Sequence, residues 1–328
     1  MQDIEPLRIV NVIDETRRRN HEKLRRELGT TICAWLDDVD IVEIMLNEDG
    51  SLWIDRLGEG MSRGGHLSSS AALSAIGTVA SFMNVTVTRQ DPILECELPL
   101  DGSRFEALIP PIVSAPVFTI RKKAVKIFTL DDYVRNSIMS VQHCDLIKQA
   151  VLERQNILVV GGTGTGKTTL TNAIINHMAE TTPDHRLVII EDTGELQCSS
   201  PNRVPLRVVE HVNMTRLLKV TMRLRPDRIL VGEVRDGAAL ALLKAWNTGH
   251  PGGAATVHAN SAEAGLIRLE QLVAEATEAP MQVLIAEAVD LVVFIERIED
   301  EPGVSRRVSK VIRVHGYDDG KYHTISLS

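Results

Sequence analysis

A glycine-rich stretch in the middle of the chain has the composition of a phosphate-binding loop. Residues 161–169, GGTGTGKTT, match the pattern G-x-x-x-x-G-K-[ST] at every fixed position, after an apolar run and before a helical pattern. Glycine lets the backbone turn so that successive N–H groups point at phosphate oxygens, and the start of a helix adds partial positive charge. The residues that we predict to bind a nucleoside triphosphate are Gly161, Gly162, Thr163, Gly164, Thr165, Gly166, Lys167, Thr168 and Thr169.

The residues that end this loop carry side chains suited to phosphate chemistry. In loops of this kind the lysine ammonium, here Lys167, reaches the β- and γ-phosphates, and the following hydroxyl, here Thr168, is a ligand for Mg²⁺. Thr169 comes next as a donor to the α-phosphate. A glycine-rich turn that binds nothing is the alternative, and the agreement of motif and context argues against it.

Carboxylates that follow two other apolar runs supply further groups that hydrolysis requires. The run RILVG is followed by Glu233, and LVII is followed by Glu191 and Asp192, with Glu195 a few residues later. Ligands bind beyond the carboxyl ends of parallel strands, which is where these acids would meet. The corresponding motif of phosphate-loop hydrolases usually ends in Asp followed by Glu. Because Gly232 takes the Asp position here, the acid on the Mg²⁺ side has to come from the neighbouring strand.

We predict separate roles for these acids. Glu233 orients or deprotonates the attacking water, since hydrolysis needs a group that activates water. The cluster EDTGE holds Mg²⁺ through its water shell, with Glu191 and Asp192 as metal-binding candidates and Glu195 as a further source of the missing acid, and Glu191 and Glu195 also assist catalysis. The alternative for Glu233 is an acid stabilised by the dipole of a following helix, and a purely structural role is also open for Glu195.

Two histidines flank a glycine pair in the stretch TGHPGGAATVHAN, residues 248–260. Their separation, the turn between them and the lack of a nearby cysteine argue against a metal site. His258 ends the apolar run AATVH, so we predict that it senses the γ-phosphate or contacts the water-activating carboxylate. A buried structural histidine is the alternative for His258. His250 begins the turn, where it either shapes the loop or faces a neighbouring subunit.

The elements that must position these residues alternate in the second half of the chain. Short apolar runs at 156–161, 187–192, 228–233 and 253–258 are mostly separated by helical patterns. Buried strands that alternate with helices predict a largely parallel sheet covered on both faces. Further predicted strands close the chain, and we place this domain at residues 144–328.

The beginning of the chain lacks this alternation. A helix over 6–29, a hairpin around the turn EDG, a helix over 68–83 and three later strands predict an α+β domain at residues 1–125. Residues 126–143 show no strong core pattern, and we predict that they connect the two domains.

The bulk composition excludes several classes of protein. Of the 328 residues, 44% are hydrophobic and 24% are charged, and no apolar run approaches the roughly 20 residues that span a bilayer. The N-terminus lacks a signal-peptide pattern and the four cysteines lie far apart, so we expect a cytoplasmic protein with reduced thiols. A net charge of −8 and 3% aromatic residues argue against tight, direct nucleic-acid binding. The basic segment 16–28 predicts either a solvated helix face or a contact with anionic lipid or a neighbouring subunit.

Four blocks now stand in order: GGTGTGKTT, LVIIEDTGEL, RLRPDRILVGEVRD and GHPGGAATVHAN. They resemble the Walker A, Asp box, atypical Walker B and His box of the secretion traffic ATPases, which power type II and type IV secretion and pilus machines. The resemblance implies an α/β fold in which a RecA-like P-loop NTPase domain with a mostly parallel sheet is preceded by a smaller α+β N-terminal domain. It also implies ATP and Mg²⁺ as ligands and a homo-hexameric ring.

The resemblance further implies that arginines of the N-terminal domain reach the γ-phosphate. The matching residues are Arg104 and Arg121, for which surface ion pairs are the alternative. Arg225, Arg228 and Arg235 flank the Walker B block, and they either bind phosphate or cross a subunit boundary.

The pilus-assembly branch of this family often carries a C-terminal tetracysteine zinc site. This chain lacks it, which favours the type IV secretion branch. The resemblance then implies a hexameric ATPase that couples ATP hydrolysis to pilus assembly or substrate transfer in conjugation. Such a protein is peripherally associated with the inner membrane and has inner-membrane and cytoplasmic components of the secretion machine as partners. The alternatives are a motor for pilus extension or retraction, and a nucleotide-gated scaffold with little turnover.

Overall fold

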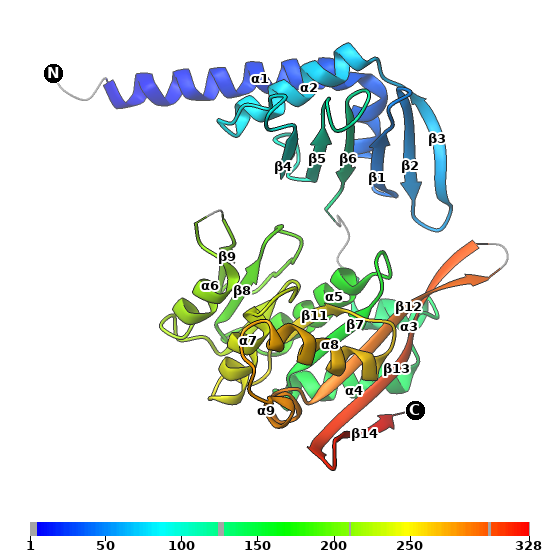
Figure 1. Ribbon diagram of the computed structural model, residues 1–328, viewed down its shortest axis with the longest axis vertical. Coiled ribbons are helices and arrows are strands. Elements are labelled where there is room, and N and C mark those ends of the chain that lie inside the picture. The colour runs from blue at the N-terminus through cyan, green and yellow to red at the C-terminus, as the bar shows by residue number, and fades with distance from the viewer. Residues whose placement is uncertain (1–4, 124–127, 210, 301–302, 328) are drawn as a thin grey trace. The chain divides into compact units, whose positions relative to one another are not determined.

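The computed structural model describes residues 5–123, 128–209, 211–300 and 303–327. The chain divides into two compact units, Met1–Val125 and Lys126–Ser328 (Figure 1). None of the described helices combines the length and the apolar character that crossing a membrane requires.

The first unit is an antiparallel sheet with two helices on one face. The strand order is β3-β2-β1-β6-β5-β4. The strands are β1 (Ile41–Leu46), β2 (Ser51–Arg56), β3 (Gly60–His66), β4 (Ile93–Glu97), β5 (Arg104–Leu108) and β6 (Val117–Arg121). Helices α1 (Glu5–Asp37) and α2 (Ser69–Phe82) pack against this sheet through one buried cluster that includes Leu28, Ile76 and Phe105. Because alternate residues of a strand point to opposite faces, the charged residues of β5 and β6 lie on the other face.

Local signals explain most of this unit. The hairpin β1–β2 is confirmed, and so is α2, whose first turn is capped by the Ser68 hydroxyl accepting from the Ala71 N–H. The predicted end of the first helix at residue 29 coincides with a kink, since Gly29 has a non-helical backbone with a φ of 82° and a ψ of 167°, and helical structure then resumes and runs to Asp37. Strand β3 was not predicted, since its sequence GMSRGGH lacks apolar alternation.

The second unit is an eight-stranded, mostly parallel sheet in the order β14-β13-β12-β7-β11-β10-β8-β9. Strands β12 to β9 of this order are parallel, and β13 and β14 add an antiparallel edge. The strands are β7 (Ile157–Gly161), β8 (Leu187–Glu191), β9 (Arg203–Arg207), β10 (Arg228–Val231), β11 (Ala254–His258), β12 (Leu291–Asp300), β13 (Gly303–Asp318) and β14 (Lys321–Leu327).

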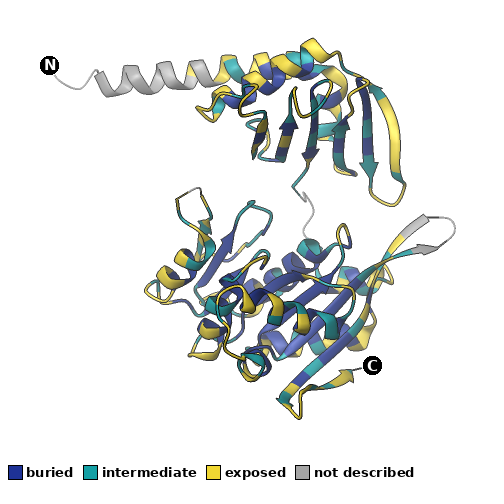
Figure 2. Cartoon of the chain, viewed as in Figure 1, coloured by how far each residue is buried: buried dark blue, intermediate teal, exposed yellow. Residues whose placement is uncertain are grey.

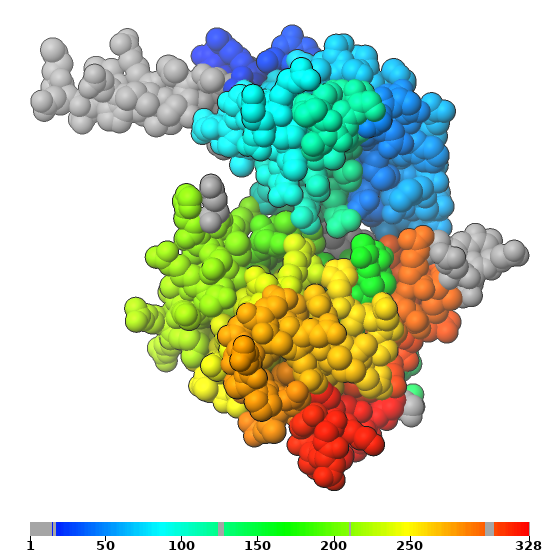
Figure 3. Space-filling view, viewed as in Figure 1, coloured from blue at the N-terminus to red at the C-terminus, as the bar shows by residue number. Residues whose placement is uncertain are grey.

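Helices cover both faces of this sheet, as buried parallel strands require. One face packs against α3 (Leu130–Arg135), α4 (Val141–Leu152) and α5 (Lys167–Thr181). The other face packs against α6 (Met214–Thr221), α7 (Ala238–Asn247), α8 (Ala262–Ala274) and α9 (Gln282–Ala288). The central strands are buried along their length (Figure 2), and α8 and α9 form part of the surface seen in Figure 3.

Residues 126–143, which we predicted to be a connection, differ from that prediction. They contain α3 and the start of α4, and Leu130, Tyr133 and Met139 are buried in the core of the second unit. The helical structure in this segment is short, with α3 spanning only Leu130–Arg135, and so few turns do not establish a helical period from the sequence. Strand β9, with the alternating sequence RVPLR at the sheet edge, was also not predicted.

The basic segment of α1 forms ion pairs along the helix. Arg18 pairs with Glu22 at 3.8 Å and Lys23 with Glu27 at 3.7 Å, and each pair is four residues apart. Such spacing is typical of a solvated helix face. All four cysteines of the chain are free thiols.

Candidate nucleotide site

The phosphate loop connects the carboxyl end of β7 to the first turn of α5. Gly164 and Gly166 adopt left-handed φ values of 70° and 93°, which side chains rarely tolerate. A Cβ at Gly161 would lie 2.3 Å from the backbone oxygen of Ile295, so the neighbouring strand leaves no room for a side chain there. The glycine spacing recognised in the sequence is therefore a requirement of this backbone path.

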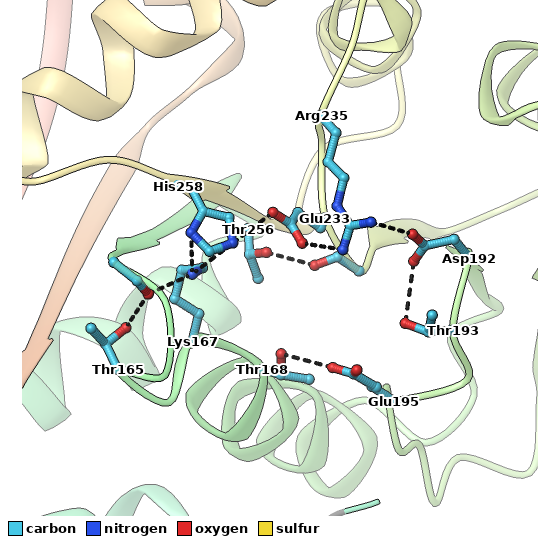
Figure 4. Close-up of polar contacts among 12 residues, drawn as sticks. Thr165, Lys167, Thr168, Asp192, Thr193, Glu195, Glu233, Arg235, Thr256 and His258 are labelled. Carbon is cyan, nitrogen blue, oxygen red and sulfur yellow. Dashed lines mark hydrogen bonds and ion pairs between the residues drawn. The ribbon is translucent and has the colours of Figure 1, made fainter. Parts of the chain in front are cut away.

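Lys167 turns back over the loop and reaches the strand beside it. Its Nζ lies 2.9 Å from the backbone oxygen of Gly162 and 3.1 Å from Nδ1 of His258 (Figure 4). The contact follows from the sheet, because β11 pairs with β7 in a register that sets His258 opposite Gly161. The predicted proximity of His258 to the phosphate-binding end of the sheet is thus present in the fold.

His258 also contacts the carboxylate that follows β10. Its Nε2 lies 2.8 Å from Oε1 of Glu233. A neutral imidazole with its proton on Nε2 satisfies both contacts, because Nε2 then donates to Glu233 and Nδ1 accepts from Lys167. Burial lowers the pKa of His258 and Lys167 lowers it further, while Glu233 opposes the shift, which favours this neutral form. The side chain is 43% exposed, so it is not a buried core histidine.

Arg235 joins the two acidic segments of the site. Its Nη2 lies 2.7 Å from Oε2 of Glu233, and its Nη1 lies 2.7 Å from Oδ2 of Asp192. The hydrogen bond to Glu233, together with both carboxylate charges, raises the pKa of the guanidinium. We had predicted that Asp192 contributes to Mg²⁺ binding, whereas its carboxylate is here paired with an arginine.

Glu195 is the acid that lies beside the hydroxyl of the phosphate loop. Thr168 Oγ1 is 3.3 Å from Glu195 Oε2 (Figure 4). The backbone oxygen of Glu195 accepts from Asn172 Nδ2 at 3.1 Å. Among the described residues no three His, Cys, Asp or Glu side chains form a metal cage. A hydroxyl and one carboxylate nevertheless fit Mg²⁺, which keeps most of its water shell and takes substrate phosphate oxygens as ligands.

Glu191 has a different environment from the one we predicted. It is only 7% exposed, and its Oε2 accepts the backbone N–H groups of Glu195 at 2.7 Å and Leu196 at 2.9 Å. Burial raises the pKa of this carboxyl, and the two N–H groups oppose that shift. The side chain therefore shapes the loop that carries Asp192 and Glu195, and its Oε2 is already used by that loop.

The side chains of the two acidic segments enclose a small cavity. Its volume is about 20 Å³, close to the roughly 10–15 Å³ that one water molecule requires. The lining residues are Thr168, Glu191, Asp192, Thr193, Glu195, Leu196, Gly232, Glu233 and Arg235. The acids that the sequence placed on two separate strands thus converge on one point.

Arg104 and Arg121 belong to the sheet of the first unit. They are direct cross-strand partners on β5 and β6, and they stand between Glu97 on β4 and Glu43 on β1. Arg121 forms an ion pair with Glu43. Their predicted contact with the γ-phosphate therefore stays a prediction.

Arg228 and His250 lie at the amino ends of the parallel strands of the second sheet, opposite the phosphate loop. Arg228 is fully buried, and it donates to the backbone oxygens of Val151 and Gly252 at 2.9 and 3.0 Å. Burial lowers its pKa to about 10. His250 Nδ1 lies 3.0 Å from the backbone oxygen of Pro226. Full burial among backbone oxygens gives Arg228 a structural role, which corrects the phosphate or subunit-boundary role predicted for it. The contact of His250 is one that a residue shaping the loop would make, and its predicted alternative, a neighbouring subunit, stays a prediction.

Arg225 is exposed and has a left-handed φ of 54°, with no phosphate-loop contact among the described residues. The sequence left Arg235 with two open roles, phosphate binding or a subunit boundary, and Thr256 was not predicted to lie in the site. Its Oγ1 donates to the backbone oxygen of Gly232 at 2.7 Å. The position of Arg235, two residues after Glu233, was the available signal for its role. Nothing in the local sequence marks Thr256.

Comparison with known proteins identifies the family to which the chain belongs. The family model described as type II/IV secretion system protein matches residues 36–309, and the chain therefore belongs to that family. The chain is 53% identical over 300 residues to the probable conjugal transfer protein TrbB of Sinorhizobium fredii, an alignment that covers 92% of this chain and 91% of that protein.

More distant relatives extend the comparison. The type IV secretion system protein VirB11 of Bartonella henselae is 30% identical over 317 residues, covering 82% of this chain and 88% of that protein. The crystal structure of the Legionella pneumophila ATPase DotB has a TM-score of 0.61 at 19% identity, covering 85% of this chain and 78% of that one. This last similarity is one of fold.

Proposed function

We propose that this protein is a hexameric ATPase of the cytoplasm, with a RecA-like catalytic domain, that couples ATP hydrolysis to pilus assembly or substrate transfer in a conjugative type IV secretion system. The contact chain from Lys167 through His258 to Glu233 carries the proposal, because it links the phosphate-binding lysine to a carboxylate suited to activating water. The names of the TrbB and VirB11 relatives supply the transport process.

The phosphate loop binds the triphosphate of ATP through its backbone N–H groups, and Lys167 then exchanges its contact with His258 for the β- and γ-phosphates. Thr168 and Glu195 would hold Mg²⁺, which neutralises charge that develops on the transferred phosphoryl group. We assign Glu195 as the carboxylate that binds Mg²⁺, because Asp192 is paired with Arg235 and Glu191 accepts backbone N–H groups.

Glu233 orients and deprotonates the attacking water. Its carboxylate is 17% exposed and held from two sides, by His258 and by Arg235, so its position is set before the substrate binds. His258 connects this carboxylate to the lysine that senses the γ-phosphate, which gives the binding and hydrolytic groups a direct link.

Membership of the family supports the proposal of a ring and its partners. A head-to-tail hexamer would let Arg104 and Arg121 approach a γ-phosphate, where a planar guanidinium suits the developing charge. Partners would be the inner-membrane and cytoplasmic components of the secretion machine, with peripheral association of the ring at the inner membrane.

Phosphate release by the purified full chain tests the proposal. Glu233→Gln should keep the affinity for ATP and lower turnover by about 100- to 10,000-fold, since it removes the base. Lys167→Ala should lose ATP binding. Glu180→Gln is the matched control, because the same chemical change falls at the far end of α5 and should leave turnover unchanged.

Two results would contradict the proposal. Full turnover by Glu233→Gln would remove this carboxylate from the mechanism. A wild-type chain that binds ATP and releases no phosphate at any protein concentration would favour the nucleotide-gated scaffold. Light scattering with and without an ATP analogue tests the hexamer, and a monomer under all conditions would exclude the ring.

A further inference from the structure

A long hairpin runs past the phosphate loop on the side away from the acids. Strand β12 pairs with β7 from Leu291 to Phe294, where β7 approaches its carboxyl end, and it then continues to Asp300. Strand β13 returns alongside it from Gly303, so that the two strands extend beyond the neighbouring strands (Figure 1). The hairpin thus stands at the sheet edge where ligands of parallel sheets bind.

This hairpin carries two arginines directly opposite each other. Arg297 on β12 and Arg306 on β13 are cross-strand partners, two residues beyond the buried pair Ile295 and Val308 on the same face. Like charges in this arrangement destabilise a hairpin. Neither arginine forms an ion pair with any side chain that the structure describes. A bound anion would offset their repulsion.

Arg306 reaches the phosphate loop itself. Its Nε lies 3.4 Å from the backbone oxygen of Gly164. A Cβ built on Gly166 would lie 3.2 Å from its Cδ, so the stem of the arginine packs against the last loop residue before α5. The guanidinium therefore lies beside the backbone that surrounds the phosphates, in a partly exposed position.

The sheet order tells which end of a nucleotide this arginine would meet. Strands β11, β10 and β8 lie on one side of β7 and carry His258, Glu233 and the loop of Glu195. These residues define the γ-phosphate side of the site. Strand β12 lies on the other side of β7, so a nucleotide with its γ-phosphate toward Glu233 directs its α-phosphate and ribose toward the hairpin.

We infer that Arg306, with Arg297 as a second cation beside it, binds the nucleotide at its α-phosphate and ribose end. A guanidinium donates from a planar fork to phosphate oxygens, and it does so across a short distance when its stem is held in place. This inference rests on the proposed function, because it takes ATP as the ligand of the loop. It adds a binding residue from a strand that none of the four sequence blocks includes.

Titration of the full chain with ATP, ADP and inorganic phosphate tests the inference. Arg306→Gln should weaken ATP and ADP by the same factor, about tenfold or more for a lost charge-assisted hydrogen bond. Inorganic phosphate, which the backbone N–H groups of the loop can hold but which is too small to extend to the α-phosphate position, should bind the variant within about twofold of wild type. Arg307→Gln is the matched control, because Arg307 lies on the opposite face of the same strand, across from Glu296.

Each other outcome separates a different explanation. An equal loss for all three ligands would mean that Arg306 only braces the loop, and a loss for ATP alone would put it at the γ-phosphate; both overturn the inference. Unchanged affinity overturns it as well. A wild-type chain that binds no ATP would overturn the proposed function too. Arg306→Lys, which keeps the charge and loses the fork, should bind ATP with intermediate affinity, and it replaces the Gln variant if that variant unfolds.

Discussion

Replacing Arg235 by Gln should lower turnover without lowering the affinity for ATP. The guanidinium is the bridge between the segment after β10 and the segment after β8, through one hydrogen bond to Glu233 and one to Asp192, both 2.7 Å long. Glutamine is too short and too weak a donor to hold both acids. Glu233 would then keep only its contact with His258 and would occupy a wider range of positions.

The expected magnitude follows from the exposure of the bridge. A hydrogen bond to a charged group contributes about 1.5–3 kcal/mol when it is buried, but exposed ion pairs contribute only about 0.2–1 kcal/mol. The Arg235 side chain is 48% exposed, so we expect about 0.5–1 kcal/mol for each contact and about 1–2 kcal/mol in total. If this energy positions Glu233 in the transition state, kcat falls by about 5- to 30-fold.

Steady-state ATP hydrolysis, with kcat and KM measured separately, checks this prediction. A residue that acts only through Glu233 changes kcat and leaves KM nearly constant. Arg235→Lys should recover only part of the rate, because one ammonium cannot match a two-armed fork. Asp192→Asn combined with Arg235→Gln should lose less than the sum of the two single losses, since both remove the same bridge.

Two results would refute this reasoning. A kcat within about twofold of wild type would show that the bridge does not position the carboxylate, since the expected loss starts at about fivefold. A free energy of unfolding that falls by as much as the activation free energy rises would show that Arg235 stabilises the fold in general. Strictly additive losses in the double variant would separate Arg235 from Asp192.

Two further predictions concern the imidazole and the packing of the sheet. Burial lowers the pKa of His258 below its ordinary value of 6.5, so the neutral form and its contacts should persist at pH 7 and be lost only as the pH falls below 6.5. NMR titration of the ring nitrogens should therefore give a midpoint below 6.5, and a midpoint above 7 would contradict the geometry. Gly253→Ala should lower the free energy of unfolding by about 1–3 kcal/mol, because its Cβ would lie 2.2 Å from Nε1 of the buried Trp246. Gly77→Ala, in an exposed helical position with open space around it, should raise that free energy by about 0.5–1 kcal/mol in the same denaturant experiment, and equal effects of the two changes would refute the packing argument.

The sequence by itself determined the chemistry of the loop and the positions of the parallel strands along the chain. GGTGTGKTT specifies its own conformation, because left-handed backbone at Gly164 and Gly166 admits few residues other than glycine. Apolar runs that end in polar residues indicated the parallel strands and the edge at which Glu233 and His258 lie. Such signals are local in the chain, so they can be read without knowing what packs against them.

Only the tertiary structure decided which partner each of the three acids in the segment after β8 contacts. Glu191, Asp192 and Glu195 stand within five residues of one another, and no local pattern distinguishes them. In the fold Glu191 accepts two backbone N–H groups, Asp192 pairs with Arg235 and Glu195 lies beside Thr168. These partners come from α5, from the segment after β10 and from the acidic loop itself, and contacts between distant segments depend on the packing of the sheet and not on sequence spacing.

The same reason explains the arginines. Arg228 begins the short strand β10 and Arg235 follows it, and the two look alike in the sequence. The strand nevertheless places them at its opposite ends. Arg228 is fully buried among backbone oxygens where the strands begin, whereas Arg235 holds two carboxylates where they end. Arg306, far along the chain, arrives at the phosphate loop only because β12 and β13 extend past β7. Which charged residues meet the loop is therefore set by strand order and strand length, two properties that belong to the folded sheet.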